Sequence, residues 1–176
     1  MSGVVRARWL PALLVVAALA GCSTSDSSDE AAPSSAAQPT IPAERQALTA
    51  YEKFWSVTDA AFAAPSAQDW TPQLEQVATG QALDSLRRDV ENYASVPAHT
   101  VGVLTRVPRV VGSTEGRVDV VDCIDLGNFR LVSDADGQAL NDLANQVPRY
   151  VYRAGLVFRD GRWLVDRTAP VLDQPC

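Results

Sequence analysis

Apolar residues in the first half of the chain follow a helical period. Between Pro42 and Pro65 they recur at three- and four-residue steps, which places them on one face of a helix. Proline suits the first turn of a helix and also ends a helix that it follows. We therefore predict a long amphipathic helix here, with these side chains facing inward: Leu48, Tyr51, Trp55, Thr58 and Phe62.

Two shorter helices are predicted next. The first begins at Thr71 and Pro72 and turns Leu74 and Val77 inward. Gly80 separates it from the second, over residues 81–95. The apolar side chains of this second helix again recur along one side: Leu83, Leu86, Val90 and Tyr93.

After Pro97 the period drops to two, which is typical of half-buried strands. Strands are predicted over residues 101–107, 117–125, 128–132, 149–159 and 162–172. Pro108 indicates a bulge or an edge after the first strand, and Asp160 with Gly161 suits a hairpin turn before the last. Three helices followed by a meander of strands predict an α+β fold with an antiparallel sheet.

The predicted strand over residues 149–159 has two unlike faces. One face carries apolar and aromatic side chains: Tyr150, Tyr152, Ala154, Leu156 and Phe158. The other face carries Arg149, Arg153 and Arg159. Because an amphipathic helix must bury its apolar stripe, we expect the first helix to lie on the aromatic face.

Aromatic side chains could also line a cavity for a lipophilic ligand. The candidates are Tyr51, Trp55, Phe62, Tyr150 and Tyr152. At these spacings aromatic residues belong to a packed core more often than to a ligand cavity. Both interpretations stay open at the level of sequence.

The first residues of the chain resemble an export signal. Arg6 and Arg8 precede an uncharged run from Trp9 to Ala20, whose length lies within the ~7–15 residues of a signal-peptide core. The run is shorter than the ~20 apolar residues of a permanent membrane helix. An ordinary cleaved signal or an uncleaved anchor would also fit this pattern.

The run ends in Leu19-Ala20-Gly21-Cys22, which resembles the lipobox of bacterial lipoproteins. The resemblance implies that residues 1–21 are removed and that the Cys22 thiol receives diacylglycerol. The protein would then be anchored in the cell membrane at its extracytoplasmic face. Two acyl chains give stable anchoring where one chain gives only marginal binding.

Residues 22–40 contain no large apolar side chain and are rich in Ser, Ala, Pro and acidic residues. Such a segment cannot bury enough surface to fold, so we expect a disordered tether with an end-to-end distance of about 20–25 Å. The remaining residues 41–176 would form one domain. The formal net charge of −6, which becomes −8 without the two leader arginines, argues against nucleic acid as a partner.

With Cys22 committed to lipid, Cys123 and Cys176 are the remaining cysteines. An exported protein matures in an oxidising compartment, which favours a disulfide between them. The chain-entropy estimate for a bond spanning 53 positions is roughly 4 kcal/mol. The alternative is two free thiols.

The order of elements and the closing hairpin "FRDGRWLV" resemble the nuclear transport factor 2-like superfamily. The resemblance implies a cone in which a long first helix lies across a strongly curved antiparallel sheet. Exported actinobacterial members with a DCxD strand and a C-terminal cysteine are a closer likeness. Here those residues are Asp122-Cys123-Ile124-Asp125 and Cys176, and in that group the two cysteines form a disulfide.

Enzymes of this superfamily, such as the ketosteroid isomerase-like and SnoaL-like branches, place an Asp or an Asp/His pair inside the cone. Asp122 is the one acid among apolar neighbours on its strand face, and His99 is the one histidine. Both are weak catalytic candidates, because Asp122 could be satisfied by arginine or backbone donors and His99 could face solvent. Asp134-Ala135-Asp136-Gly137 lacks the glutamate of a calcium loop, so we expect a turn, no metal and no cofactor.

The leading functional expectation is a non-enzymatic envelope lipoprotein. Its domain would bind an envelope protein partner or a lipophilic ligand. The alternative is a proton-transfer enzyme of the SnoaL or isomerase type that acts on a lipophilic metabolite, with Asp122 or His99 moving the proton.

Overall fold

The computed structural model describes residues 42–140 and 147–176. The predictions for the leader, the lipidated Cys22 and the tether lie outside these residues. Within them, no helix is both long and apolar enough to cross a bilayer.

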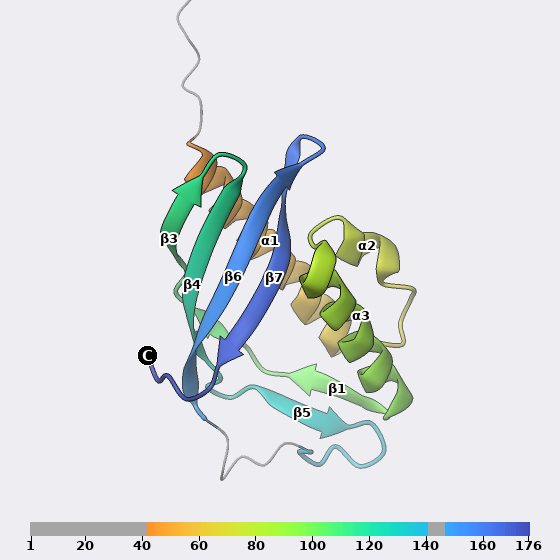
Figure 1. The fold of residues 1–176 in the computed structure, drawn as a ribbon. Coiled ribbons are helices and arrows are strands. Elements are labelled where there is room, and N and C mark those ends of the chain that lie inside the picture. Colours follow the sequence, from red (N-terminus) through yellow and green to blue (C-terminus); the bar gives the residue numbers. More distant parts are fainter. Residues whose placement is uncertain (1–41, 141–146) are drawn as a thin grey trace, which may run out of the picture. The chain divides into compact units, whose positions relative to one another are not determined.

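Three helices precede all of the strands (Figure 1). They are α1 (Ala43–Ala63), α2 (Thr71–Glu75) and α3 (Gly80–Ser95). The strands are β1 (Ala98–Val101), β2 (Thr105–Arg106), β3 (Arg109–Thr114), β4 (Arg117–Asp125), β5 (Arg130–Ser133), β6 (Arg149–Arg159) and β7 (Arg162–Val171). The predicted α+β class with an antiparallel sheet is confirmed.

The main sheet is antiparallel throughout, with β4 beside β6 and β6 beside β7. Both β2 and β3 pair with the same side of β4, one after the other. A separate two-stranded sheet joins β1 to β5. Figure 1 shows α1 behind the main sheet, while α3 lies beside β7.

The prediction of one continuous strand over residues 101–107 is wrong. Gly102 adopts φ +89, and a Cβ at this position would come within 2.5 Å of the Asn128 carbonyl oxygen. Glycine alone tolerates this left-handed conformation at so close an approach. The chain therefore leaves β1, which pairs with β5, and joins the main sheet as β2 only from Thr105.

The core lies between α1 and the inner face of the main sheet. Tyr51, Trp55 and Thr58 are buried as predicted, whereas Leu48 and Phe62 are only partly buried. Phe54, which was not predicted to face inward, is also buried, with 1% of its surface exposed. The buried sheet residues of the same cluster are Val118, Val120, Ile124, Ala154, Leu156, Trp163 and Val165.

The prediction that Phe158 lies under the first helix is also wrong. Phe158 is 46% exposed, although strand alternation places it on the same face of β6 as the buried Leu156. It lies two positions before the β6–β7 turn and packs against Trp163 of β7, with ring centroids 5.4 Å apart. The core has ended before this point of the strand.

The free edge of β7 is covered by the segment between α2 and α3. Val165 exchanges backbone hydrogen bonds with this segment, donating to Val77 at 3.0 Å and accepting from Thr79 at 2.8 Å. Further along, the Thr168 amide donates to Gln81 Oε1 at 2.8 Å. Covering an edge in this way protects it from pairing with another chain.

Candidate functional site

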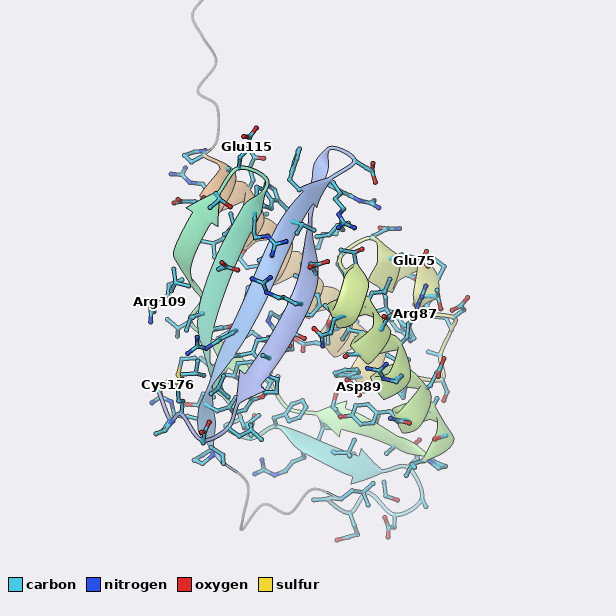
Figure 2. All side chains as sticks on the ribbon, viewed as in Figure 1. Glu75, Arg87, Asp89, Arg109, Glu115 and Cys176 are labelled. Carbon is cyan, nitrogen blue, oxygen red and sulfur yellow. A yellow bond between two sulfur atoms is a disulfide. The ribbon has the colours of Figure 1, made fainter. Side chains whose placement is uncertain are left out.

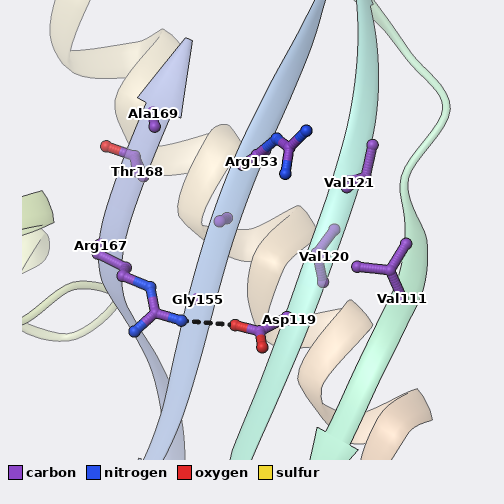
Figure 3. Close-up of a pocket in the computed structure, with 10 residues that line it drawn as sticks. Val111, Asp119, Val120, Val121, Arg153, Gly155, Arg167, Thr168 and Ala169 are labelled. Carbon is purple, nitrogen blue, oxygen red and sulfur yellow. Dashed lines mark hydrogen bonds and ion pairs between the residues drawn. The ribbon is translucent and has the colours of Figure 1, made fainter. Parts of the chain in front are cut away.

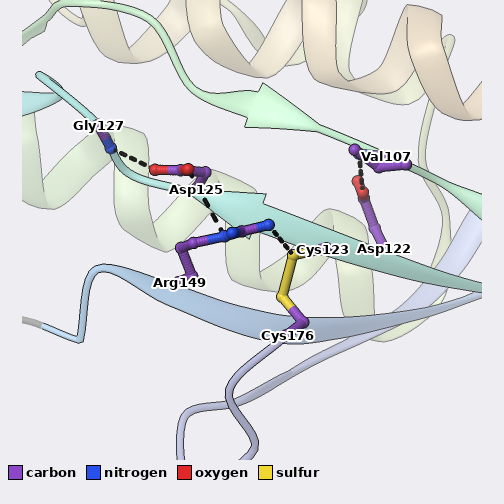
Figure 4. The surroundings of a disulfide bond; sticks show 7 residues. All are labelled: Val107, Asp122, Cys123, Asp125, Gly127, Arg149 and Cys176. Atoms are coloured by element: carbon purple, nitrogen blue, oxygen red, sulfur yellow. Dashed lines mark hydrogen bonds and ion pairs between the residues drawn. A yellow bond between two sulfur atoms is a disulfide. The ribbon is translucent and has the colours of Figure 1, made fainter.

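A buried carboxylate joins the first helix to the middle of the sheet. Asp122 of β4 points inward between Val120 and Ile124 and is 0% exposed. The Tyr51 hydroxyl donates to its Oδ2 at 3.0 Å. The Val107 amide donates to its Oδ1 at 2.7 Å (Figure 4). Both carboxylate oxygens therefore have a donor.

The local sequence explains why this carboxylate is needed. Val107 lies between β2 and β3, and the next residue, Pro108, has no N–H to continue the ladder. The Val107 amide is left without a backbone acceptor where the two short strands meet. The side chain of Asp122 supplies that acceptor from the neighbouring strand.

Burial and hydrogen bonding act on this pair in opposite directions. Burial raises the pKa of Asp122, while the Tyr51 hydroxyl, the Val107 amide and the Arg106 cation oppose the rise. Burial also raises the pKa of Tyr51 well above its usual range; the Trp55 indole opposes this rise and the Asp122 charge adds to it. The tyrosine is thus held neutral as a hydrogen-bond donor.

An aromatic cluster fills the space around the pair. Phe54 and Trp55 have ring centroids 5.4 Å apart, and Trp55 lies 5.2 Å from the ring of Tyr152 on β6. Tyr51 contacts both neighbouring rings of the helix at 6.2 and 6.3 Å. Burial raises the pKa of Tyr152 to about 12. These contacts are those of a packed core.

Arg106 closes the outer side of this cluster. Its guanidinium carbon lies 4.2 Å from the centre of a Trp55 ring, and its Nη2 donates to Asp59 Oδ1 of α1 at 2.7 Å. Together with Tyr51 and Pro108, these residues border an open depression of about 440 Å³. Arg106 Nε and Trp55 Nε1 are buried, and neither has an acceptor in bonding geometry among the described residues.

The structure does not bring the two catalytic candidates together. His99 belongs to β1 of the small sheet, whereas Asp122 belongs to the main sheet. The His99 ring Nδ1 lies 2.5 Å from Asp134 Oδ1, and its side chain is partly exposed. An Asp/His pair of the superfamily type is therefore not assembled from these residues.

The five predicted cavity residues occupy different environments. Tyr51 and Trp55 are buried and border the open depression described above. Phe62 is half-buried against Tyr93, with ring centroids 5.0 Å apart. Tyr150 and Tyr152 are partly buried against the same core.

The disulfide between Cys123 and Cys176 is confirmed, with Cα atoms 5.7 Å apart. Figure 4 shows it on the opposite side of β4 from Asp122, next to Arg149. Val151 donates to the Gln174 carbonyl at 2.9 Å, so the C-terminal segment is also hydrogen-bonded to β6. This clamp serves the scaffold, on the face away from the core.

No group of three or more metal-binding side chains occurs within residues 42–140 and 147–176. Gly137 has φ +70, and Gln138 donates its amide to Asp136 Oδ1 at 3.1 Å, so the Asp134–Gly137 segment is a turn. The roles of Arg106 and Val107 were not predicted from the sequence. Pro108 was the one available signal, because it indicated an interruption in the edge strand.

No family model matches the chain, and a search of curated proteins finds no match either. Among solved structures, the intermembrane space region of the chloroplast protein ARC6 is similar with a TM-score of 0.53 and 15% identity, over 75% of this chain and 98% of that one. A designed β-sheet protein is similar with a TM-score of 0.38 and 10% identity, over 72% of this chain and 88% of that one. A protein assigned as a scytalone dehydratase from Novosphingobium aromaticivorans is similar with a TM-score of 0.42 and 11% identity, over 70% of this chain and 81% of that one. The chain thus shares an α+β fold with the ARC6 region.

Proposed function

We propose that this protein is a non-enzymatic lipoprotein of the cell envelope, whose folded domain is an interaction module. In this proposal residues 1–21 are a signal peptide and Cys22 carries the lipid. The domain is a nuclear transport factor 2-like cone, with α1 lying across the sheet.

The observation that carries the proposal is the filled inner face of the sheet. An enzyme of the superfamily type needs an accessible carboxylate in an apolar pocket. Asp122 is instead wholly buried, and both of its oxygens accept hydrogen bonds that tie α1 and the β2–β3 junction to β4. A carboxylate in this setting stabilises a fold and has no route to substrate.

The order of charged, apolar and small residues in the leader supports the lipid anchor. Two arginines, a short uncharged run and the Leu-Ala-Gly-Cys sequence occur in the order that lipoprotein export requires. An anchored module that binds another envelope protein benefits from being held at the membrane. An enzyme acting on a small diffusing metabolite gains little from it.

One observation favours the alternative, a lipophilic small-ligand site or a proton-transfer enzyme. The depression of about 440 Å³ borders Tyr51 and Trp55, and Tyr51 contacts Asp122 directly. A ligand in this depression would lie one side chain away from the carboxylate. Movement of Arg106 away from Asp59 would open the approach.

The test is affinity capture of the full-length protein from membranes of its own cells, with Asp122→Asn as the comparison. The proposal expects a discrete partner protein at similar yield from both proteins, because the carboxylate is structural. Loss of the partner on release of the protein by Cys22→Ala would support the role of the anchor. If no partner is captured and cells carrying a well-folded Asp122→Asn protein accumulate a metabolite, the enzyme alternative replaces the proposal.

A further inference from the structure

The outer face of the main sheet, opposite α1, has a regular composition that follows from its register. One row across the strands holds Cys123, Val151 and Val171. The next row holds Arg109, Val121, Arg153 and Ala169. A third row holds Gly112, Asp119, Gly155 and Arg167, with Val111 at the register shift beside it. Aliphatic and arginine side chains thus share one face.

Aliphatic side chains stay accessible on this face. Val111 is 49% exposed, and Val121, Val151 and Val171 are partly exposed. A hollow of about 380 Å³ lies between Val111, Val121, Arg153 and Arg167, and Figure 3 shows the side chains that line it. No helix lies over it among the described residues, since α1 and α3 pack elsewhere.

Gly155 shapes the floor of this hollow. The Arg167 side chain crosses over it to reach Asp119 on the second strand along, where its Nη2 donates to Oδ1 at 2.8 Å (Figure 3). A Cβ at Gly155 would lie 2.8 Å from Arg167 Nε. The absence of a side chain at Gly155 therefore lets Arg167 pair with Asp119, and it keeps the hollow open.

Two other arginines of the face, Arg109 and Arg153, lack an acidic partner among the described residues, whereas Arg149 lies 3.6 Å from Asp125. Arg153 donates only to the neutral Gln174 side chain, at 3.3 Å. Arg109 makes no ion pair within the described ranges, and Figure 2 shows it projecting from the edge of the sheet. With Asp119 offsetting Arg167 and Asp125 offsetting Arg149, the face keeps the charge of Arg109 and Arg153, although the whole chain carries −6.

We propose that this outer face, defined by Arg109, Val111, Val121, Arg153 and Ala169, docks a partner protein segment that presents carboxylates beside aliphatic side chains. The inference rests on the proposed interaction function and names its surface. Two guanidinium forks suit carboxylates, since each fork can donate two parallel hydrogen bonds. The valines between them suit aliphatic side chains of the same segment.

Charge selects this occupant over two others. A second copy would set the same arginines of the two faces against each other, which electrostatic complementarity disfavours. An anionic bilayer would repel a chain whose net charge is −6. An acidic partner segment instead meets the unpaired positive charge of Arg109 and Arg153 on this face.

The experiment selects twelve-residue peptides from a phage-displayed library on the immobilised, detergent-purified full-length protein. Selected peptides are expected to combine at least two Asp or Glu residues with aliphatic residues. The Arg109→Glu/Arg153→Glu double variant should weaken binding of these peptides at least about tenfold, and added salt should weaken binding to the original protein. Arg109→Lys/Arg153→Lys should keep most of the binding.

Arg45→Glu/Arg88→Glu is the matched control, because it changes the net charge equally at exposed positions of α1 and α3. It should leave peptide binding unchanged. Thermal unfolding of each variant verifies folding. Peptides without acidic residues, or binding insensitive to the Arg109/Arg153 reversal, would overturn this inference and leave the proposed function standing.

Two further outcomes would also overturn the inference in favour of another occupant. One is a dimer in sedimentation that the Arg109→Glu/Arg153→Glu variant loses. The other is binding of the protein to phosphatidylglycerol vesicles that the same variant loses. If no peptide is selected, the inference fails, and the capture of a cellular partner decides the proposed function separately.

Discussion

The hydroxyl of Tyr51 donates to Asp122 Oδ2 at 3.0 Å, across the interface between α1 and β4. The two residues are 71 positions apart and are both inaccessible to solvent. Buried polar groups are retained where they have partners, and each side chain here is the other's partner. The contact fixes the rotation of α1 on the sheet and places Trp55 between Arg106 and Tyr152.

Buried Asp122 should make stability depend on pH in a defined direction. Burial raises the folded-state pKa of Asp122 above its ordinary value of 3.8, so the folded protein holds this proton more tightly than the unfolded chain. The stabilising contribution is present below pH 3.8 and is lost as pH rises through the raised folded pKa. The free energy of unfolding, measured in urea for the original protein and for Asp122→Asn, should therefore differ in a way that changes with pH.

The free energy of unfolding of the original protein minus that of the variant should decrease between about pH 3.5 and pH 7, because Asp122 is the one titrating group that the two proteins do not share. Other acids change equally in both proteins and cancel. A difference that rises with pH would mean that the ionised carboxylate is the favoured buried form.

Trp55→Ala should lower the free energy of unfolding by about 3–5 kcal/mol, the range for removal of a large aromatic side chain from a core. Trp55 is 8% exposed and contacts Phe54, Tyr152 and Arg106. Chemical denaturation measures the loss, with Lys53→Ala on the exposed side of the same helix as control. A loss close to zero would indicate that Trp55 faces an open ligand site.

Features that depend on one helix or strand could be predicted from the sequence, whereas features that depend on contacts between elements could not. The 3.6-residue period placed Tyr51 and Trp55 inward, and strand alternation placed Asp122 among apolar neighbours. Both are local properties of one element. Phe54 was missed because the apolar stripe of α1 is broader than the single row of positions that we assigned to it.

Other features depend on contacts between elements, which a period does not report. The Gly102 turn is determined by the carbonyl of Asn128, and the exposure of Phe158 by where the core ends along β6. At the candidate site, Asp122 could be singled out by its neighbours. Its donors Tyr51 and Val107 could not, since one lies on another element and the other is a backbone amide.

Removal of the disulfide should destabilise the folded domain. Cys123→Ala/Cys176→Ala should lower the free energy of unfolding by roughly 4 kcal/mol on the chain-entropy estimate for this loop. The Val151 amide, which donates to the Gln174 carbonyl, should then exchange its proton faster with solvent, because the C-terminal segment loses its covalent clamp. Hydrogen exchange with mass spectrometry measures this. Unchanged protection at Val151 would show that the segment holds without the bond.

The lipid anchor has its own test, which is independent of the domain. Cells fed labelled palmitate should incorporate label into the original protein and none into Cys22→Ala. The variant should stay as precursor or be released from the membrane, since no acyl chain holds it. Label in the Cys22→Ala protein would refute the lipobox assignment.

The central claim is that Asp122 serves the fold, and the stability of Asp122→Ala tests it most directly. The substitution leaves the Tyr51 hydroxyl and the Val107 amide buried without an acceptor, at about 1–3 kcal/mol each. We expect a loss of about 2–5 kcal/mol for Asp122→Ala, and of about 1 kcal/mol or less for Asp122→Asn, whose amide still offers an acceptor. An unchanged or increased stability of Asp122→Ala would contradict the claim, because residues retained for catalysis often reduce stability.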